Sequence, residues 1–163
     1  MSKAKAAPFF LAAFMLAGHL HADEVAFLKT LEGNWRGSGE VRLKPESGSV
    51  DVSCTLKSNA SGTSVVMDGQ CTGLLIFSRP LSASLQAEGN SYSGSYIGSP
   101  RGTANLSGNR KGETLDLHVQ WPNQSARMEL ASPGNGQMQI RTIETHPKTG
   151  EPVVTVQIAL VRE

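Results

Sequence analysis

Two histidines after residue 22, His118 and His146, are the side chains best suited to acid–base chemistry. Asp116 lies two residues before His118, and alternate residues of a strand share a face, so the two have the spacing of a general base or of half a metal site. Nothing else clusters with them in the sequence, which favours a surface pair. His146 lies in a His-Pro-Lys-Thr-Gly run, which is typical of a turn, so we expect this histidine to be exposed.

Other catalytic signatures are missing from the sequence. There is no Gly-x-Ser-x-Gly elbow and no phosphate-binding loop. Glu40 and Glu129 lie among alternating charges, without the apolar surroundings that raise the pKa of a carboxyl group. We therefore expect a protein that is not an enzyme and that uses neither a cofactor nor a metal.

The two cysteines, Cys54 and Cys71, offer a different chemistry. Their spacing is too wide for a CxxC redox motif, and two thiols alone make a poor zinc site. A minimal, even number of cysteines in an exported protein favours one disulfide, worth about 3 kcal/mol for a loop of this length. Cys54 shares a side with apolar residues of an alternating stretch, so we expect the bond to lie against the core.

Residues 1–22 have the organisation of a secretory signal peptide. Two lysines precede an apolar segment, 8–18, that is too short to span a bilayer, and Ala22 is a small residue suited to a cleavage site. A retained anchor is the alternative, which the length disfavours. His19 stands where a lipoprotein signal would need cysteine. We predict cleavage near Ala22 and a periplasmic or secreted mature chain, 23–163, that forms a single domain.

The charge balance of the mature chain argues against a polyanionic partner. The full sequence has 15 basic and 14 acidic residues, and the predicted signal contains two lysines and no acid, so the mature chain has 13 against 14 and a net charge of −1. Without a dense basic run, we expect no nucleic-acid partner. We also expect a monomer with no transmembrane segment, because its predicted strands are polar on one face and aromatic residues are few.

One helix is predicted, from Asp23 to Leu31. Asp23 can cap it, Glu24 suits its first turn, and Gly33 is placed to end it. Beyond it, turn-forming residues recur at short intervals, around 45–48, 59–62, 88–90, 99–102, 109–112, 122–124, 133–136 and 146–150. This spacing predicts an all-β fold, an antiparallel up-and-down β-barrel of about 8–10 strands with one short N-terminal helix.

Apolar and polar residues alternate strictly within the predicted strands, which places one face inside the barrel. Several inner positions carry small residues: Gly37, Gly39, Ala83, Ala87, Gly94, Gly98 and Ala104. Such residues let strands coil sharply at barrel corners, or they leave space for a ligand. The sequence leaves both explanations open.

A helix followed by Gly33-x-Trp35 and an antiparallel meander resembles the start of the calycin group, which includes the lipocalins and avidins. The resemblance implies that Trp35 packs across the closed end of the barrel and that ligands enter at the open end. A wider resemblance covers most of the mature chain. The segments 37–41, 52–54, 69–71, 92–96 and 160–162 are similar to small exported proteins of mainly alphaproteobacterial cell envelopes, which implies a periplasmic barrel with one disulfide.

We predict first that the barrel binds a small or lipid-like ligand at its open end, largely by apolar burial. The predicted lining residues are Trp35, Leu56, Tyr92, Tyr96, Trp121 and Met128. One alternative is a protein-interaction module such as a periplasmic metalloprotease inhibitor, a similar barrel that uses an N-terminal arm. The other is an envelope-maintenance factor without a ligand. A cavity beside Trp35 would favour the first hypothesis, and a solid core the others.

Overall fold

The computed structural model describes residues 17–73 and 77–163, so most of the predicted signal peptide lies outside the described residues. Helix α1 (Ala17–Leu31) comes first and ten strands follow. The strands are β1 (Gly33–Arg42), β2 (Ser49–Ser61), β3 (Ser64–Gly73), β4 (Phe77–Glu88), β5 (Ser91–Ser99), β6 (Gly102–Lys111), β7 (Thr114–Trp121), β8 (Gln124–Ala131), β9 (Gln137–Thr145) and β10 (Pro152–Arg162). In the described part of the chain, no helix combines the length and apolar character needed to cross a membrane.

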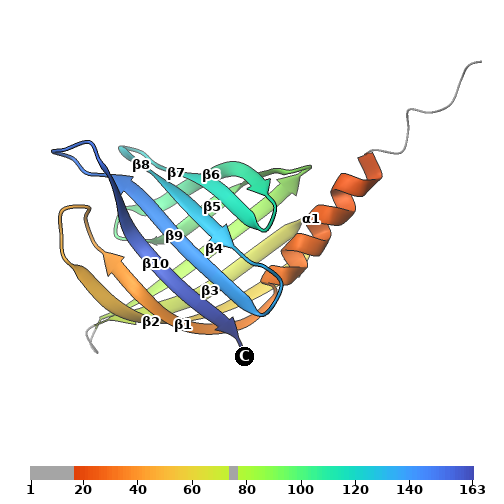
Figure 1. Cartoon of the computed structure of the whole chain (residues 1–163), viewed down its shortest axis with the longest axis horizontal. Helices are drawn as coiled ribbons and strands as arrows, with labels where there is room; N and C mark the ends of the chain where they lie inside the picture. The colour runs from red at the N-terminus through yellow and green to blue at the C-terminus, as the bar shows by residue number, and fades with distance from the viewer. Residues whose placement is uncertain (1–16, 74–76) are drawn as a thin grey trace, which may run out of the picture.

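The ten strands form a closed barrel. Each strand pairs antiparallel with its neighbours in the chain, and β1 pairs with β10 to close the sheet (Figure 1). The predicted all-β up-and-down barrel with one helix is therefore confirmed. All eight predicted turn regions fall at strand connections, where Gly62, Gly89 and Gly112 have positive φ angles of 57°, 59° and 62°. The connection from β3 to β4, 74–76, lies outside the described residues.

Helix α1 covers one end of the barrel, which we call the base; the opposite end is the mouth (Figure 1). The helix packs against β2 and β3 and buries Phe27, Leu28 and Leu31 in the core. It begins at Ala17 rather than at Asp23, because alanine and leucine residues before Asp23 also favour helix. The segment from Asp23 onward is thus a docked helix and not an extended arm.

Trp35 seals the base from inside the barrel. Its side chain is 1% exposed, and its indole Nε1 donates a hydrogen bond of 2.9 Å to the carbonyl oxygen of Leu31 at the end of α1. The guanidinium of Arg162, at the end of β10, lies 4.8 Å from the ring centroid. Helix, first strand and last strand therefore meet at this indole.

Several inner glycines allow neighbouring backbones to approach closely. A Cβ on Gly37 would lie 1.9 Å from the carbonyl oxygen of Ala159, and one on Gly94 would lie 1.8 Å from that of Ser84. At these two positions the structure supports the explanation that small residues let the strands coil.

Substituting Gly94 with alanine should therefore push β5 away from β4. Because the obstacle is backbone, we expect the free energy of unfolding to fall by about 2 kcal/mol. Gly48→Ala is the matched control, since a Cβ there meets nothing within 4 Å. Urea unfolding of both variants measures the difference, and equal stabilities would contradict the close-approach explanation.

Strand β10 departs from simple alternation at one point. Its pairing with β9 shifts between Val154 and Val156, so Thr155 is a bulge residue with its side chain 2% exposed. Strict alternation along the last strand, expected from the sequence, puts Val154 on the same face as Val156, Ile158 and Leu160. That placement of Val154 is wrong, because the bulge pairs it with Ile143, on the outer face of β9.

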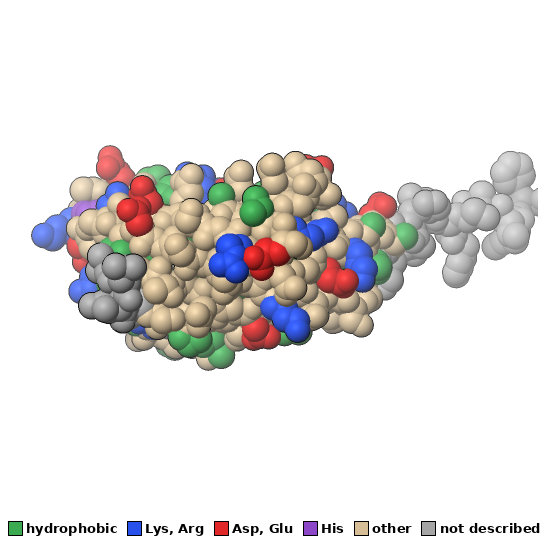
Figure 2. Space-filling model, turned by 90° about the horizontal axis from the view of Figure 1, so that it is seen from below, with side chains coloured by type: hydrophobic (Ala, Val, Ile, Leu, Met, Phe, Trp, Pro, Cys, Tyr) green, Lys and Arg blue, Asp and Glu red, His purple; other side chains and the backbone are tan. Residues whose placement is uncertain are grey.

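The outer surface of the barrel is mainly polar. On the face in Figure 2, basic and acidic side chains are interspersed and hydrophobic ones occur in small, separate groups. The inward-facing residues of the strands, by contrast, make up the core. The interior of the barrel is therefore the first place to look for a site that binds an apolar molecule.

Candidate functional site

The mouth of the barrel contains a cavity of about 410 Å³. Its wall includes Leu43, which is 56% exposed, so the cavity reaches the surface. Most of the side chains around it are apolar, and the full lining consists of Val41, Arg42, Leu43, Val50, Val52, Cys71, Gly73, Arg79, Leu81, Tyr96, Gly98, Pro100, Arg101, Trp121, Thr142, Glu144, Val156 and Ile158. Ligand pockets in proteins are typically about 300–1,000 Å³, so the space suits a small molecule.

The half of the barrel nearer the base is solid. Leu115, Leu117, Val119 and Met138 are each at most 1% exposed and pack in one cluster with the apolar side chains of α1. Interior packing of this kind leaves no room for a ligand. The barrel is therefore filled at its base and hollow at its mouth. Trp35 lies in the packed core and not beside the cavity, where the ligand hypothesis had placed it; the cavity instead lies beside Trp121.

The predicted lining residues divide between these two halves. Tyr96 and Trp121 line the cavity. Trp35, Leu56 and Tyr92 are buried in the core, and Met128 packs partly buried against that core; none of these four is among the lining residues. The sequence placed all six on inward faces, but it contained nothing to show how far along the barrel axis each would lie.

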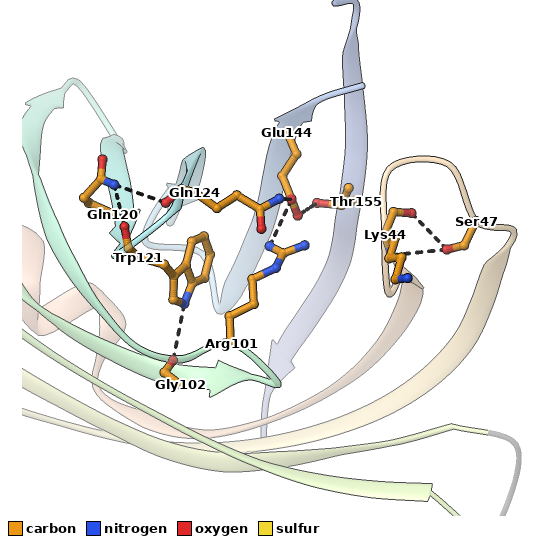
Figure 3. A network of polar contacts seen from close by, with 9 residues as sticks. All are labelled: Lys44, Ser47, Arg101, Gly102, Gln120, Trp121, Gln124, Glu144 and Thr155. Atoms are coloured by element: carbon orange, nitrogen blue, oxygen red, sulfur yellow. Dashed lines mark hydrogen bonds and ion pairs between the residues drawn. The ribbon is translucent and has the colours of Figure 1, made fainter. Parts of the chain in front are cut away.

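Glu144 is the buried carboxylate of the cavity wall. Its side chain is 6% exposed and accepts hydrogen bonds from Thr155 Oγ1 (2.9 Å) and Gln124 Nε2 (3.1 Å), while Arg101 Nη1 lies 2.9 Å from its Oε2 (Figure 3). The bulge in β10 is what brings Thr155 to this carboxylate. Three donors from three separate elements thus satisfy the one negative charge.

Arg101 extends from the β5–β6 turn into this wall (Figure 3). Besides its ion pair with Glu144, its guanidinium lies 5.2 Å from the ring centroid of Trp121. The Trp121 Nε1 in turn donates a hydrogen bond of 3.3 Å to the carbonyl oxygen of Gly102. The guanidinium is consequently held between a carboxylate and an indole, with a defined position at the mouth.

Tyr96 brings a phenol to the same region. Burial raises the pKa of the Tyr96 hydroxyl, and the positive charges of Arg79 and Arg101 oppose that rise, so both guanidiniums act on this group. A Cβ on Gly98 would come within 2.5 Å of the hydroxyl oxygen, so glycine at this position leaves space for the ring. Two arginines and a tyrosine therefore converge from β4, β5 and the β5–β6 turn.

Arg79, Arg101, Thr142 and Glu144 were not predicted as site residues, although the sequence held a signal for some of them. Thr142 and Glu144 continue the inward row that begins with Met138 and Ile140. Arg79 likewise precedes Leu81 at the inner spacing of β4. An inward row that turns polar toward one end of its strand indicates which end holds a polar site.

The predicted disulfide is present. Cys54 and Cys71 are bonded to each other, and they face one another in the register of β2 and β3. Cys54 is 4% exposed, and Cys71 lines the cavity. The bond therefore ties together two strands of the cavity wall and lies against the core.

The other candidates for chemistry lie outside the cavity. Asp116 binds Arg127 through two hydrogen bonds of 2.7 and 2.9 Å, and the hydrogen bonds from Arg127 lower the pKa of this carboxyl group. His118 is exposed, and His146 accepts hydrogen bonds from the backbone of its own turn. Within 17–73 and 77–163, no group of three or more His, Cys, Asp or Glu residues is arranged to hold a metal ion.

A second hollow of about 410 Å³ lies on the outside of β1, β2 and β3. Its lining is mostly hydroxyl and amide side chains, among them Ser38, Ser53, Thr55 and Gln70. It lacks both the apolar wall and the convergent charges of the inner cavity, which is therefore the stronger candidate site.

Comparison with known proteins supports the fold. No protein-family model and no curated protein sequence matches this chain. Among solved structures, it is similar to Rv2717c from M. tuberculosis, with a TM-score of 0.67 and 12% identity over 86% of this chain and 97% of that one. It is also similar to the S-type phycobiliprotein lyase CPES from Guillardia theta, with a TM-score of 0.58 and 11% identity over 88% and 97%. At these identities the likeness shows a shared fold, that of a small β-barrel.

Proposed function

We propose that this protein is an exported, non-enzymatic β-barrel that binds a small, largely apolar ligand in the cavity at its mouth. The observation that carries the proposal is the cavity itself, a space of about 410 Å³ with a mainly apolar wall in a barrel whose base is sealed. Burying apolar ligand surface there would supply most of the binding free energy.

Export is the second part of the proposal. The signal-like N-terminus and the disulfide support it, since disulfides persist in oxidising compartments. The described contacts of α1 with the barrel come from residues that follow the predicted cleavage site, among them Glu24, Leu28 and Thr30. Cleavage near Ala22 would thus leave the sealed base in place, and the mature chain would act as a monomer in the periplasm or outside the cell. We include in this proposal a relation to the small exported proteins of alphaproteobacterial envelopes.

A tryptophan substitution inside the cavity tests the location of binding. Val52 lines the cavity, and Val52→Trp would fill part of it. We expect the affinity for the uncharged fluorescent probe N-phenyl-1-naphthylamine to fall by about tenfold, the equivalent of 1.4 kcal/mol. Probe titration followed by fluorescence measures this change.

Val66→Trp is the matched control, because Val66 is on the outer face of β3 and is 45% exposed. This variant should bind the probe as the wild type does. A Val52→Trp protein that folds and binds with unchanged affinity would refute binding in the cavity. Native mass spectrometry of protein purified from its own host would identify what the cavity holds.

A further inference from the structure

We propose that the ligand is an amphiphile with an anionic head group, a carboxylate, that lies beside Arg79 and Arg101 while its apolar part occupies the rest of the cavity. This inference rests on the proposed function. It adds the chemical class of the ligand, which an apolar wall alone would not specify.

The charge of the cavity wall is the first argument. Of the described lining residues, Arg42, Arg79 and Arg101 are cationic and Glu144 alone is anionic, so the wall carries a net charge of +2. A charge excess in mainly apolar surroundings is poorly screened, and an anionic ligand group offsets it. A cationic head group would add to the excess instead.

The arrangement of the arginines is the second argument. Glu144 and Trp121 hold the Arg101 guanidinium at the wall before any ligand arrives, with the carboxylate 2.9 Å away and the ring centroid 5.2 Å away. Donors fixed in advance lose little side-chain entropy when a ligand binds. Guanidinium is also the side-chain group whose planar set of donors matches a carboxylate.

Tyr96 is the third argument. Its hydroxyl is within the electrostatic range of both Arg79 and Arg101, so a neutral hydrogen-bond donor accompanies the two charges. These three groups come from different elements and line the same cavity as apolar residues such as Val52 and Ile158. A cavity that combines charged donors with a mainly apolar wall matches an amphiphile.

Displacement of N-phenyl-1-naphthylamine by ten-carbon ligands at pH 7.4 tests the head group. We expect decanoate to displace the probe at concentrations about tenfold lower than decanol, since hydrogen bonds to a charged group contribute about 1.5–3 kcal/mol. Decylamine should be weaker than decanol. Acetate, the head group without a chain, should not displace the probe.

Two substitutions assign the preference to residues. Arg79→Gln and Arg101→Gln should each reduce the advantage of decanoate over decanol by about threefold or more, with decanol affinity unchanged. Arg141→Gln is the control, because Arg141 is exposed on the outer face of β9. If Arg101→Gln lowers the thermal midpoint through the loss of its contact with Glu144, Arg79→Gln remains the decisive variant.

The outcomes separate this inference from the proposed function. Equal displacement by decanoate, decanol and decylamine would overturn the anionic head group and leave apolar binding standing. Displacement by acetate alone would show a site for free anions and overturn the amphiphile. A wild-type protein that binds neither the probe nor any of the four ligands would overturn both proposals.

Discussion

Glu24→Ala is expected to lower the free energy of unfolding by about 3 kcal/mol, at the lower end of the range for breaking a buried ion pair. The Glu24 carboxylate, 2% exposed, receives two hydrogen bonds of 2.8 Å from the guanidinium of Arg110 and one from the hydroxyl of Tyr92. Its removal would leave the positive charge of Arg110 and a buried phenol without their acceptor. Because the Arg110 side chain is 19% exposed, water would relieve part of that cost.

The same contact predicts how stability depends on pH. Burial alone would raise the pKa of Glu24, but the hydrogen bonds from Arg110 and Tyr92 and the charge of Arg110 outweigh it, so the pKa lies below its ordinary value. A carboxyl group with a lowered pKa in the folded state adds stability above its unfolded pKa, about 4.3. That contribution should be lost as the pH falls through the folded pKa, and Glu24→Ala should lack this part of the acid dependence.

Urea unfolding at pH 7 and at several lower pH values measures both effects. Asp23→Asn is the matched control, because Asp23 is the neighbouring acid in α1 and is exposed. Its stability should stay within about 0.5 kcal/mol of the wild type. A Glu24→Ala protein as stable as Asp23→Asn would mean that this network does not hold the helix to the barrel.

Removing the disulfide should lower the free energy of unfolding by about as much as Glu24→Ala does. For the loop that Cys54 and Cys71 close, with a sequence separation of 17, the loop-entropy model gives about 3 kcal/mol. We therefore expect the double variant Cys54→Ala/Cys71→Ala to unfold at a clearly lower urea concentration. Because Cys71 also lines the cavity, ligand-free protein should be used for this measurement.

Wild-type protein in the presence of a reductant provides the internal control. It should lose about the same stability as the double variant, since both remove the same cross-link. A loss of less than about 1 kcal/mol in both would show that the pairing of β2 and β3 already restricts the unfolded chain. A loss confined to the double variant would trace the effect to the missing side-chain volume instead.

Much of the fold followed from local patterns. Strict alternation placed Trp35, Cys54 and Leu117 inside, and Gly and Pro clusters marked eight of the nine strand connections. Alternation and turns are properties of a few consecutive residues, so a sequence shows them directly. The β3–β4 connection lacked such a cluster, since the residues at 74–76 are Leu-Leu-Ile.

Other features depended on residues distant in the sequence. Glu24 was expected to lie in the first turn of a helix, where an acidic residue is favourable. In the structure its carboxylate binds Arg110, 86 residues away. Val154 was placed on the inner face by alternation, but a bulge in β10 puts it on the outer face and leaves Thr155 hydrogen-bonded to Glu144. A bulge adds one residue to a strand and so changes which residues face inward on its two sides. No local pattern in the sequence of β10 indicates where the bulge lies.

The sequence by itself determined that this chain is a disulfide-linked barrel with one helix and an apolar interior. Only the tertiary structure decided that the interior is solid around Trp35 and hollow around Trp121. The physical reason is that a period of two specifies the side of the sheet but not the height along the barrel. Height follows from register and strand tilt, which depend on all ten strands at once, and it is height that brings Arg79, Tyr96 and Arg101 together at the mouth.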